Sequence, residues 1–443
     1  MKQGLNLIYL HTHDTGRYVQ PYDPNAVTPN LMRLAREGCV FRSAFCCGPT
    51  CSPSRSGLVT GLYPHQNGMY GLAHRGFSLH DYSRHLGSWL RSHGMETVLC
   101  GVHHEAADVS SLGYSHVFQE EAPGMSSLEA DTRNTEKAVE FLRGPHEKPF
   151  FLSLGLHNTH RPFEGIDPGI EPDYVKVPAC LPDTDETRRD FAEFLTSAKR
   201  ADTCFGRVLD CVRELGLEDN TLVFYTTDHG PAFPHMKCTL RDDGIGVSLI
   251  LKYPGNPMAG KVCDAMVSHL DLYPTLCEAA GVPLPGPVEG RSLFPLLEGS
   301  EEKLHDAIFS EINYHAAPEP ARCVRTQRWK YIVEYAPETG TVPANIDGGA
   351  SKDFLAQFGL LTHGKDREQL YDLMLDPAEG CNLAGNPEYT SVLSEMRELL
   401  RRHMERTDDF LLHGKLPVVP GSFINNVTCV DPESTDPADY TYF

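Results

Sequence analysis

The sequence predicts an α/β fold in which helices cover both faces of a mostly parallel central sheet. Short apolar runs alternate with amphipathic helical patterns from residue 6 to residue 280, which is the order of elements in such folds. The apolar runs have polar and turn residues at their ends, as expected of strands that are buried on both faces. Histidines and aspartates follow several of these runs, at the strand ends where ligands bind in parallel sheets.

Each predicted element has its own signal in the sequence. The first run carries Ile8 and Leu10 between polar residues, and Thr28-Pro29 then begins a helix that stops at Gly38. The predicted strands are 6–12, 40–45, 96–100, 149–156, 220–226 and 247–251, and the predicted helices are 28–38, 82–93, 187–215 and 270–280.

A Pro- and Gly-rich stretch at 281–290 is the best candidate for a boundary between two parts of the chain. We therefore expect a larger domain at 1–300 and a smaller subdomain at 301–443. Short strand patterns at 307–310, 323–325 and 330–333 precede a helical pattern at about 388–406.

The bulk composition is that of a globular protein, with 40% hydrophobic and 22% charged residues among 443. The net charge of −21 argues against nucleic acid or an anionic membrane as a partner, because both attract clustered Lys and Arg. No apolar run approaches the ~18 to 20 residues of a membrane span. The first residues lack the apolar core of a signal peptide, so we expect a cytoplasmic protein, although a cleaved leader would leave the same sequence.

The fourteen cysteines are scattered without paired spacing, which predicts reduced thiols and no disulfide framework. The sequence has no CxxC pair, so we expect no structural zinc knuckle.

One cysteine lies in a distinctive setting, the stretch CSPSRSGLVTG at 51–61. Pro53 is near the first position of a helical run, so Cys51 is predicted at a turn between a strand and a helix. The positive end of that helix and Arg55 would together suit an anion such as sulfate or phosphate. Spacing alone favours a buried and inert cysteine on a capped helix.

This stretch resembles the signature of type I sulfatases, in which the cysteine is converted to formylglycine. Further matching segments lie at 5–18, 64–72, 157–162, 216–230 and 370–383, so the resemblance covers nearly the whole chain. The run PHQNGMYGL resembles the sulfamidase branch of that family. The resemblance implies an alkaline-phosphatase-like α/β fold with a smaller C-terminal antiparallel sheet-and-helix subdomain. It also implies hydrolysis of a sulfate ester or sulfamate of a sulfated sugar, and a maturase that generates the formylglycine.

By the same resemblance, one divalent metal ion is held by His13, Asp14, Asp228, His229 and the group derived from Cys51. Calcium is the family expectation, while two imidazoles beside two carboxylates also suit manganese, zinc or another transition metal. From its own sequence context, His13 could equally be a core histidine bonded to a carbonyl.

The resemblance assigns the catalytic roles as well. One hydroxyl of a formylglycine hydrate attacks sulfur, and deprotonation of the other expels sulfate and restores the aldehyde. His104 matches the histidine that takes this proton, and His160 matches the group beside the leaving atom. Arg55 and Lys237 match charges around the substrate and the nucleophile. The residues predicted to bind or support the substrate are His65, Asn67, Tyr70, His103 and His157.

Val102 departs from the family pattern, which has a lysine there between the sulfate and the nucleophile. Some phosphonate monoester and phosphodiester hydrolases of the superfamily also lack this lysine, so such a hydrolase is the alternative function. A non-catalytic binding protein is a third hypothesis, and the presence of Cys51, Arg55, Asp228 and His104 together argues against it.

Overall fold

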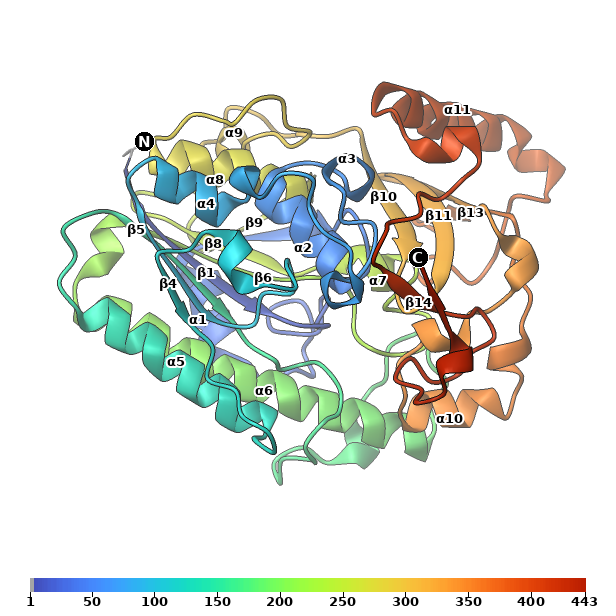
Figure 1. The fold of residues 1–443 in the computed structure, drawn as a ribbon, viewed down its shortest axis with the longest axis horizontal. Helices are drawn as coiled ribbons and strands as arrows, with labels where there is room; N and C mark the ends of the chain where they lie inside the picture. The colour runs from blue at the N-terminus through green and yellow to red at the C-terminus, as the bar shows by residue number, and fades with distance from the viewer. Residues whose placement is uncertain (1–3) are drawn as a thin grey trace.

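The computed structural model describes residues 4–443, and its largest element is a nine-stranded sheet (Figure 1). The strand order is β4-β3-β5-β1-β6-β8-β2-β7, with β9 paired to β2. These strands are β1 (Asn6–Thr12), β2 (Cys39–Phe45), β3 (Glu96–Gly101), β4 (His116–Phe118), β5 (Phe150–Gly155), β6 (Thr221–Thr227), β7 (Gly246–Val247), β8 (Leu249–Lys252) and β9 (Lys261–Ser268).

The sheet is mostly parallel, as the sequence predicts. Strand β1 pairs in parallel with β5 and β6, and β3 pairs in parallel with β4 and β5. The strand predicted at 247–251 is divided into β7 and β8, which run antiparallel to their neighbours.

Helices cover both faces of this sheet, and β1 shows why. Leu7 and Tyr9 pack in one apolar cluster with residues of α2, α4 and α8, while Ile8 and Leu10 pack in another with α1, α5 and α6. Figure 1 shows the long helices α5 and α6 along one side and α4 and α8 on the other. The bounds are α1 (Pro29–Glu37), α2 (Cys51–Thr60), α4 (Leu86–Ser92), α5 (Ser127–Arg143), α6 (Asp185–Glu214) and α8 (Leu272–Ala280).

Helix α5 and strand β9 are absent from the sequence prediction. The buried face of α5 includes Asp131, Asn134 and Thr135, so few large apolar residues mark this helix in the sequence. Strand β9 begins with exposed residues and carries the exposed Asp264, which hides its apolar alternation. The helix predicted at 82–93 is also interrupted, because a 3₁₀ turn at Tyr82–Arg84 precedes α4.

The C-terminal part contains a four-stranded antiparallel sheet, as the sequence analysis expects. Its strands are β10 (Ala307–Tyr314), β11 (Pro318–Thr326), β12 (Trp329–Glu334) and β13 (Glu368–Asp372). Helix α11 (Thr390–Arg406) packs on this sheet, and β14 (Phe423–Asn425) pairs with β15 (Tyr440–Tyr442). The shorter helices are α3 (Pro64–Asn67), α7 (Asp242–Ile245), α9 (Phe294–Leu297) and α10 (Ala350–Ala356). The boundary at 300/301 stays a prediction.

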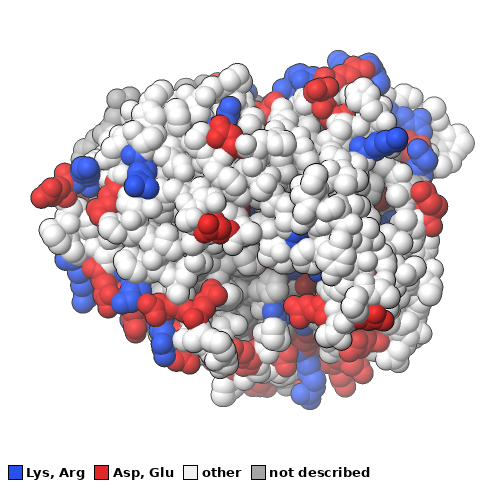
Figure 2. All heavy atoms as spheres, viewed as in Figure 1, with Lys and Arg blue, Asp and Glu red and all other residues white. Residues whose placement is uncertain are grey.

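The surface view shows how charged side chains are distributed over one face of the molecule. Acidic and basic side chains gather along the edge formed by α5, while the centre of this face carries few charges (Figure 2).

Within residues 4–443, no helix is both long and apolar enough to cross a bilayer. All fourteen cysteines are free thiols. Residues 1–3, which belong to the segment used for the leader prediction, lie outside the described residues.

Candidate active site

The polar residues that follow β1 and β6 lie side by side, because these parallel strands are neighbours in the sheet. His13 and Asp14 come directly after β1, and Asp228 and His229 come directly after β6. One ligand atom from each of His13, Asp14, Cys51 and Asp228 lies within 4.8 Å of the others. His229 Nε2 lies 3.4 Å from Asp14 Oδ1. The structure therefore brings the five predicted metal-site residues together.

Cys51 is the first residue of α2, which is buried along its whole length. A side chain at Gly57 would come within 2.2 Å of the Cys47 sulfur, so α2 can pack against Cys47 in this way only with glycine at position 57. The helix ends at Gly61, whose φ of 68° is in the left-handed region. Burial raises the pKa of the Cys51 thiol, so the unmodified side chain is a weak nucleophile.

Buried polar atoms of this cluster are suited to a cation. In the described part of the chain, Asp14 Oδ1 and His229 Nε2 are buried without hydrogen-bond partners. His229 donates from Nδ1 to the Gly230 carbonyl at 2.9 Å, so Nε2 is the ring nitrogen that faces Asp14. Two imidazoles and two carboxylates are an appropriate donor set for a divalent metal, so these residues fit the implied ion.

Arg55 orients one of these carboxylates. It donates to Asp228 Oδ2 at 3.0 Å and to the Thr12 carbonyl at 3.1 Å, and its other terminal nitrogen lies 2.7 Å from His11 Nδ1. Burial opposes the charge on Asp228, but His229 and Arg55 hold the pKa of its carboxyl well below the usual range. Asp228 is therefore ionised and fixed in orientation.

His104 lies on the nucleophile side of the cluster. Its ring centroid is 4.4 Å from that of His13, and ligand atoms of His13, Cys51 and His104 lie within 4.8 Å of one another. Burial, with the nearby His13 and Arg55, holds the pKa of His104 well below its usual value. His104 is thus a neutral imidazole that can accept a proton.

His160 lies on the more open side. It donates from Nδ1 to the Arg161 carbonyl at 2.6 Å, and its Nε2 lies 3.8 Å from Asp14 Oδ2. The side chain of His160 is 35% exposed, whereas that of Asp14 is 0% exposed. A ligand can therefore approach the cluster past His160.

Lys237 connects the cluster to the C-terminal part of the chain. Its ammonium donates to Asp14 Oδ2 at 2.8 Å and to Asp347 Oδ1 at 3.3 Å. Burial opposes the charge on Lys237, but Asp14 and Asp347 raise the pKa of its ammonium well above the usual value. Burial likewise opposes ionisation of Asp347, yet the ammonium of Lys237 holds the pKa of that carboxyl low.

Asp347 and His315 are site residues that the sequence analysis missed. Asp347 is 110 positions from Lys237, in a loop without strand or helix periodicity, so no local signal marks it. His315 lies in the turn between β10 and β11, and its buried Nδ1 has no hydrogen-bond partner among the described residues. Burial lowers the pKa of His315, so its ring is neutral.

The predicted substrate-binding residues occupy internal contacts. His65 is buried against Glu311 of β10, and the Asn67 amide donates to Ser56, Thr60 and Leu62. The other contacts join the Tyr70 hydroxyl to His80, His103 Nδ1 to the Glu105 N–H, and His157 Nε2 to Glu121. Their role in substrate binding stays a prediction. Val102, directly after β3, is buried and brings neither a charge nor a side-chain donor.

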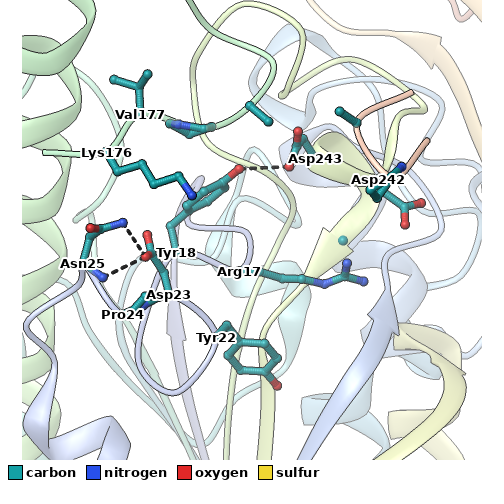
Figure 3. A pocket seen from close by; sticks show the side chains of 15 residues that line it. Arg17, Tyr18, Tyr22, Asp23, Pro24, Asn25, Lys176, Val177, Asp242 and Asp243 are labelled. Atoms are coloured by element: carbon teal, nitrogen blue, oxygen red, sulfur yellow. Dashed lines mark hydrogen bonds between the residues drawn. The ribbon is translucent and has the colours of Figure 1, made fainter. Parts of the chain in front are cut away.

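A separate cavity of about 400 Å³ lies beside the loop after β1 and includes none of the predicted site residues in its lining (Figure 3). Figure 3 shows Tyr18 hydrogen-bonded to Asp243, and Asn25 to Asp23. Arg17 donates to the Ala44 carbonyl at 3.0 Å and lies over the Phe45 ring. We assign no ligand to this cavity.

The sulfatase family matches residues 7–282, and the family described as "N-sulphoglucosamine sulphohydrolase, C-terminal" matches residues 235–341. The chain is 30% identical to human N-sulphoglucosamine sulphohydrolase over 459 aligned residues, covering 91% of this chain and 90% of that protein. This chain belongs to the sulfatase family.

Solved sulfatases share its fold. A putative sulfatase from Bacteroides thetaiotaomicron superposes with a TM-score of 0.73 at 24% identity, covering 95% of this chain and 96% of that one. The phosphonate monoester hydrolase of Agrobacterium radiobacter superposes with a TM-score of 0.70 at 20% identity, covering 91% and 96%. As a sulfatase, the protein is a hydrolase of sulfuric esters or sulfamates.

Proposed function

We propose that this sulfatase hydrolyses the sulfamate of an N-sulfated glucosamine-type sugar, using a formylglycine derived from Cys51 and one divalent metal. The observation that carries the proposal is the convergence of Cys51 with two imidazoles and two carboxylates, with His104 and His160 beside them. The similarity to human N-sulphoglucosamine sulphohydrolase over 91% of the chain supports this substrate class.

The metal would be held by His13, Asp14, Asp228 and His229, and by the group derived from Cys51. When bound, such an ion polarises the sulfuryl oxygens and favours the ionised form of the attacking hydroxyl. Calcium is the family expectation, and the two imidazoles also suit manganese or zinc. Arg55 keeps Asp228 in position, and Lys237 does the same for Asp14.

Two histidines have opposite proton roles in this proposal. Neutral His104 lies near Cys51 Sγ and is suited to take a proton from the group that replaces the thiol. His160 already donates from Nδ1 to a carbonyl, so Nε2 is the nitrogen available to the leaving group. A sulfamate releases an amine, which needs a proton as the S–N bond breaks, and His160 in its imidazolium form supplies it from Nε2.

The test uses protein that was co-expressed with a maturase and loaded with metal. Incubation with glucosamine N-sulfate is expected to release inorganic sulfate and glucosamine in equal amounts, and the Cys51 peptide should show loss of sulfur by mass spectrometry. Cys51→Ala is the matched control and should release neither product. Matured protein that releases no sulfate from this substrate contradicts the proposal.

The buried Val102 favours one second candidate, hydrolysis of a phosphonate monoester or phosphodiester. Valine offers no positive group at this position, so recognition of a sulfate there must depend on other residues. A comparison of kcat/KM for glucosamine N-sulfate and for a phosphonate monoester separates the two candidates.

A further inference from the structure

The loop that carries Asp347 is held in place at several points. Lys352 donates to the carbonyls of Pro343, Ile346 and Val430 at 2.9, 2.6 and 3.1 Å. Asn345 accepts from the Ala317 N–H at 2.9 Å. These hydrogen bonds fix the position of the segment that contains Asp347. A binding residue whose position is fixed before the ligand arrives favours selective binding.

The same loop is tied directly to the segment that carries His160. Both oxygens of Asp190 accept from Arg161 at 2.8 Å, and one of them also accepts from the Ser351 N–H at 3.0 Å. The loops approach so closely that a side chain at Gly349 would come within 2.3 Å of Arg161. Asp347 and His160 therefore belong to one fixed arrangement.

Asp347 has acceptor capacity that the protein does not use. Its Oδ1 has a contact of 3.3 Å with Lys237, and its Oδ2 has no hydrogen-bond partner among residues 4–443. The Asp347 side chain is 18% exposed, while the side chains of Asp14 and Asp228 are 0% exposed. A carboxylate offers about four lone-pair positions. The unpartnered Oδ2 is itself buried, so it is an acceptor that a donor group of a ligand bound beside His160 would satisfy.

The chemistry of such a ligand follows from the charges. The Asp347 carboxylate repels the anionic sulfuryl group. It is therefore suited to bind the sugar part of the substrate, which carries the leaving atom. A hydrogen bond to an ionised partner is roughly twice as strong as a neutral one, so an amine that becomes ammonium gains more from Asp347 than a hydroxyl does.

We propose that Asp347 is a specificity-determining residue that accepts a hydrogen bond from the leaving nitrogen of a sulfamate, and so favours sulfamates over O-sulfates. The inference rests on the proposed function. As the S–N bond breaks, its electron pair stays on nitrogen, which takes one proton from His160; a second proton from water then gives the ammonium. Asp347 keeps its own charge throughout and binds the N–H group.

The experiment measures kcat/KM for glucosamine N-sulfate and for glucosamine 6-O-sulfate, with wild type and Asp347→Asn. The variant is expected to lower the ratio of N-sulfate to O-sulfate turnover by roughly 10-fold to 100-fold, the value of a hydrogen bond to a charged group. Asp353→Asn, on an exposed residue of α10, is the matched control and should leave the ratio unchanged. An equal loss for both substrates overturns the inference.

A second measurement does not depend on the variant's folding. Glucosamine should inhibit the wild-type enzyme at least ~10-fold more strongly than glucose at a pH where its amine is protonated, because only glucosamine gives Asp347 a charged donor. Equal inhibition by the two sugars overturns the inference. Failure of the proposed function has a different signature, because wild type would then release no sulfate from glucosamine N-sulfate.

Discussion

Arg55 donates to Oδ2 of Asp228 across 3.0 Å, and the two side chains are 1% and 0% exposed. The pair joins α2, which begins with Cys51, to the end of β6. It thus fixes the distance between the nucleophile position and a predicted metal ligand.

Arg55→Met should lower the free energy of unfolding by about 3 to 5 kcal/mol, because it removes the guanidinium that pairs with the buried Asp228 carboxylate. Urea denaturation measures this change. Arg33→Met is the matched control, since Arg33 pairs with Asp210 on the surface and should contribute less than about 1 kcal/mol. Similar small losses in both variants would show that the Arg55 pair does not stabilise the fold.

Divalent metal should stabilise the protein against heat, because it would satisfy the orphaned atoms of Asp14 and His229. An ion at 100 times its dissociation constant adds about 2.7 kcal/mol. The melting temperature and the metal content should both fall on chelation and recover when metal is returned. His229→Ala should abolish the response, while His116→Ala, an exposed surface change, should retain it. A response that survives His229→Ala would contradict the assignment.

Stability should depend on pH through Asp131, which accepts hydrogen bonds from His157 and Asn158. Burial raises the pKa of this carboxyl from 3.8 to about 6. The folded state therefore binds the proton more tightly than the unfolded state, and this contribution is present below pH 3.8 and lost as pH rises to about 6.

The corresponding change in unfolding free energy is about 3 kcal/mol across that range. Asp131→Asn removes the ionisation, so the stability of wild type relative to the variant should be higher at pH 4 than at pH 7. Denaturation of both proteins at the two pH values measures this difference. A constant or reversed difference would mean that Asp131 ionises normally in the folded state.

Gly349→Ala should weaken catalysis, because its added methyl would come within 2.3 Å of the Arg161 guanidinium and disturb its pairing with Asp190 next to His160. The φ of 150° at Gly349 also disfavours a side chain. Turnover and melting temperature are both expected to fall. Gly348→Ala is the neighbouring control, since nothing lies within 4 Å of a side chain there. Equal behaviour of the two variants would contradict the close approach.

The sequence predicted the parallel sheet because its strands have a local signal, as in Asn6–Thr12 and Thr221–Thr227. It also predicted that residues after those strands meet, since parallel strand ends lie on one edge of the sheet. Helix α5 was missed because Asp131 and Asn134 lie on its buried face, where tertiary hydrogen bonds replace apolar packing.

The less predictable part of the site comes from long-range contacts. Asp347 reaches Lys237 from a loop with no periodic pattern, and only the folded chain shows that they meet. His65 shows the same limit, because its motif suggested a sugar contact but gave no sign of the buried pairing with Glu311, 246 positions away. The local sequence predicts the strands and their ends. It does not predict which distant loop lies beside those ends in the folded chain.

The central claim is that this site hydrolyses a sulfamate. The most direct measurement compares kcat/KM of the matured, metal-loaded protein for glucosamine N-sulfate, an aryl sulfate and a phosphonate monoester. We expect glucosamine N-sulfate to lead the other two substrates by orders of magnitude. A phosphonate monoester that leads by orders of magnitude would contradict this account and favour the second candidate function.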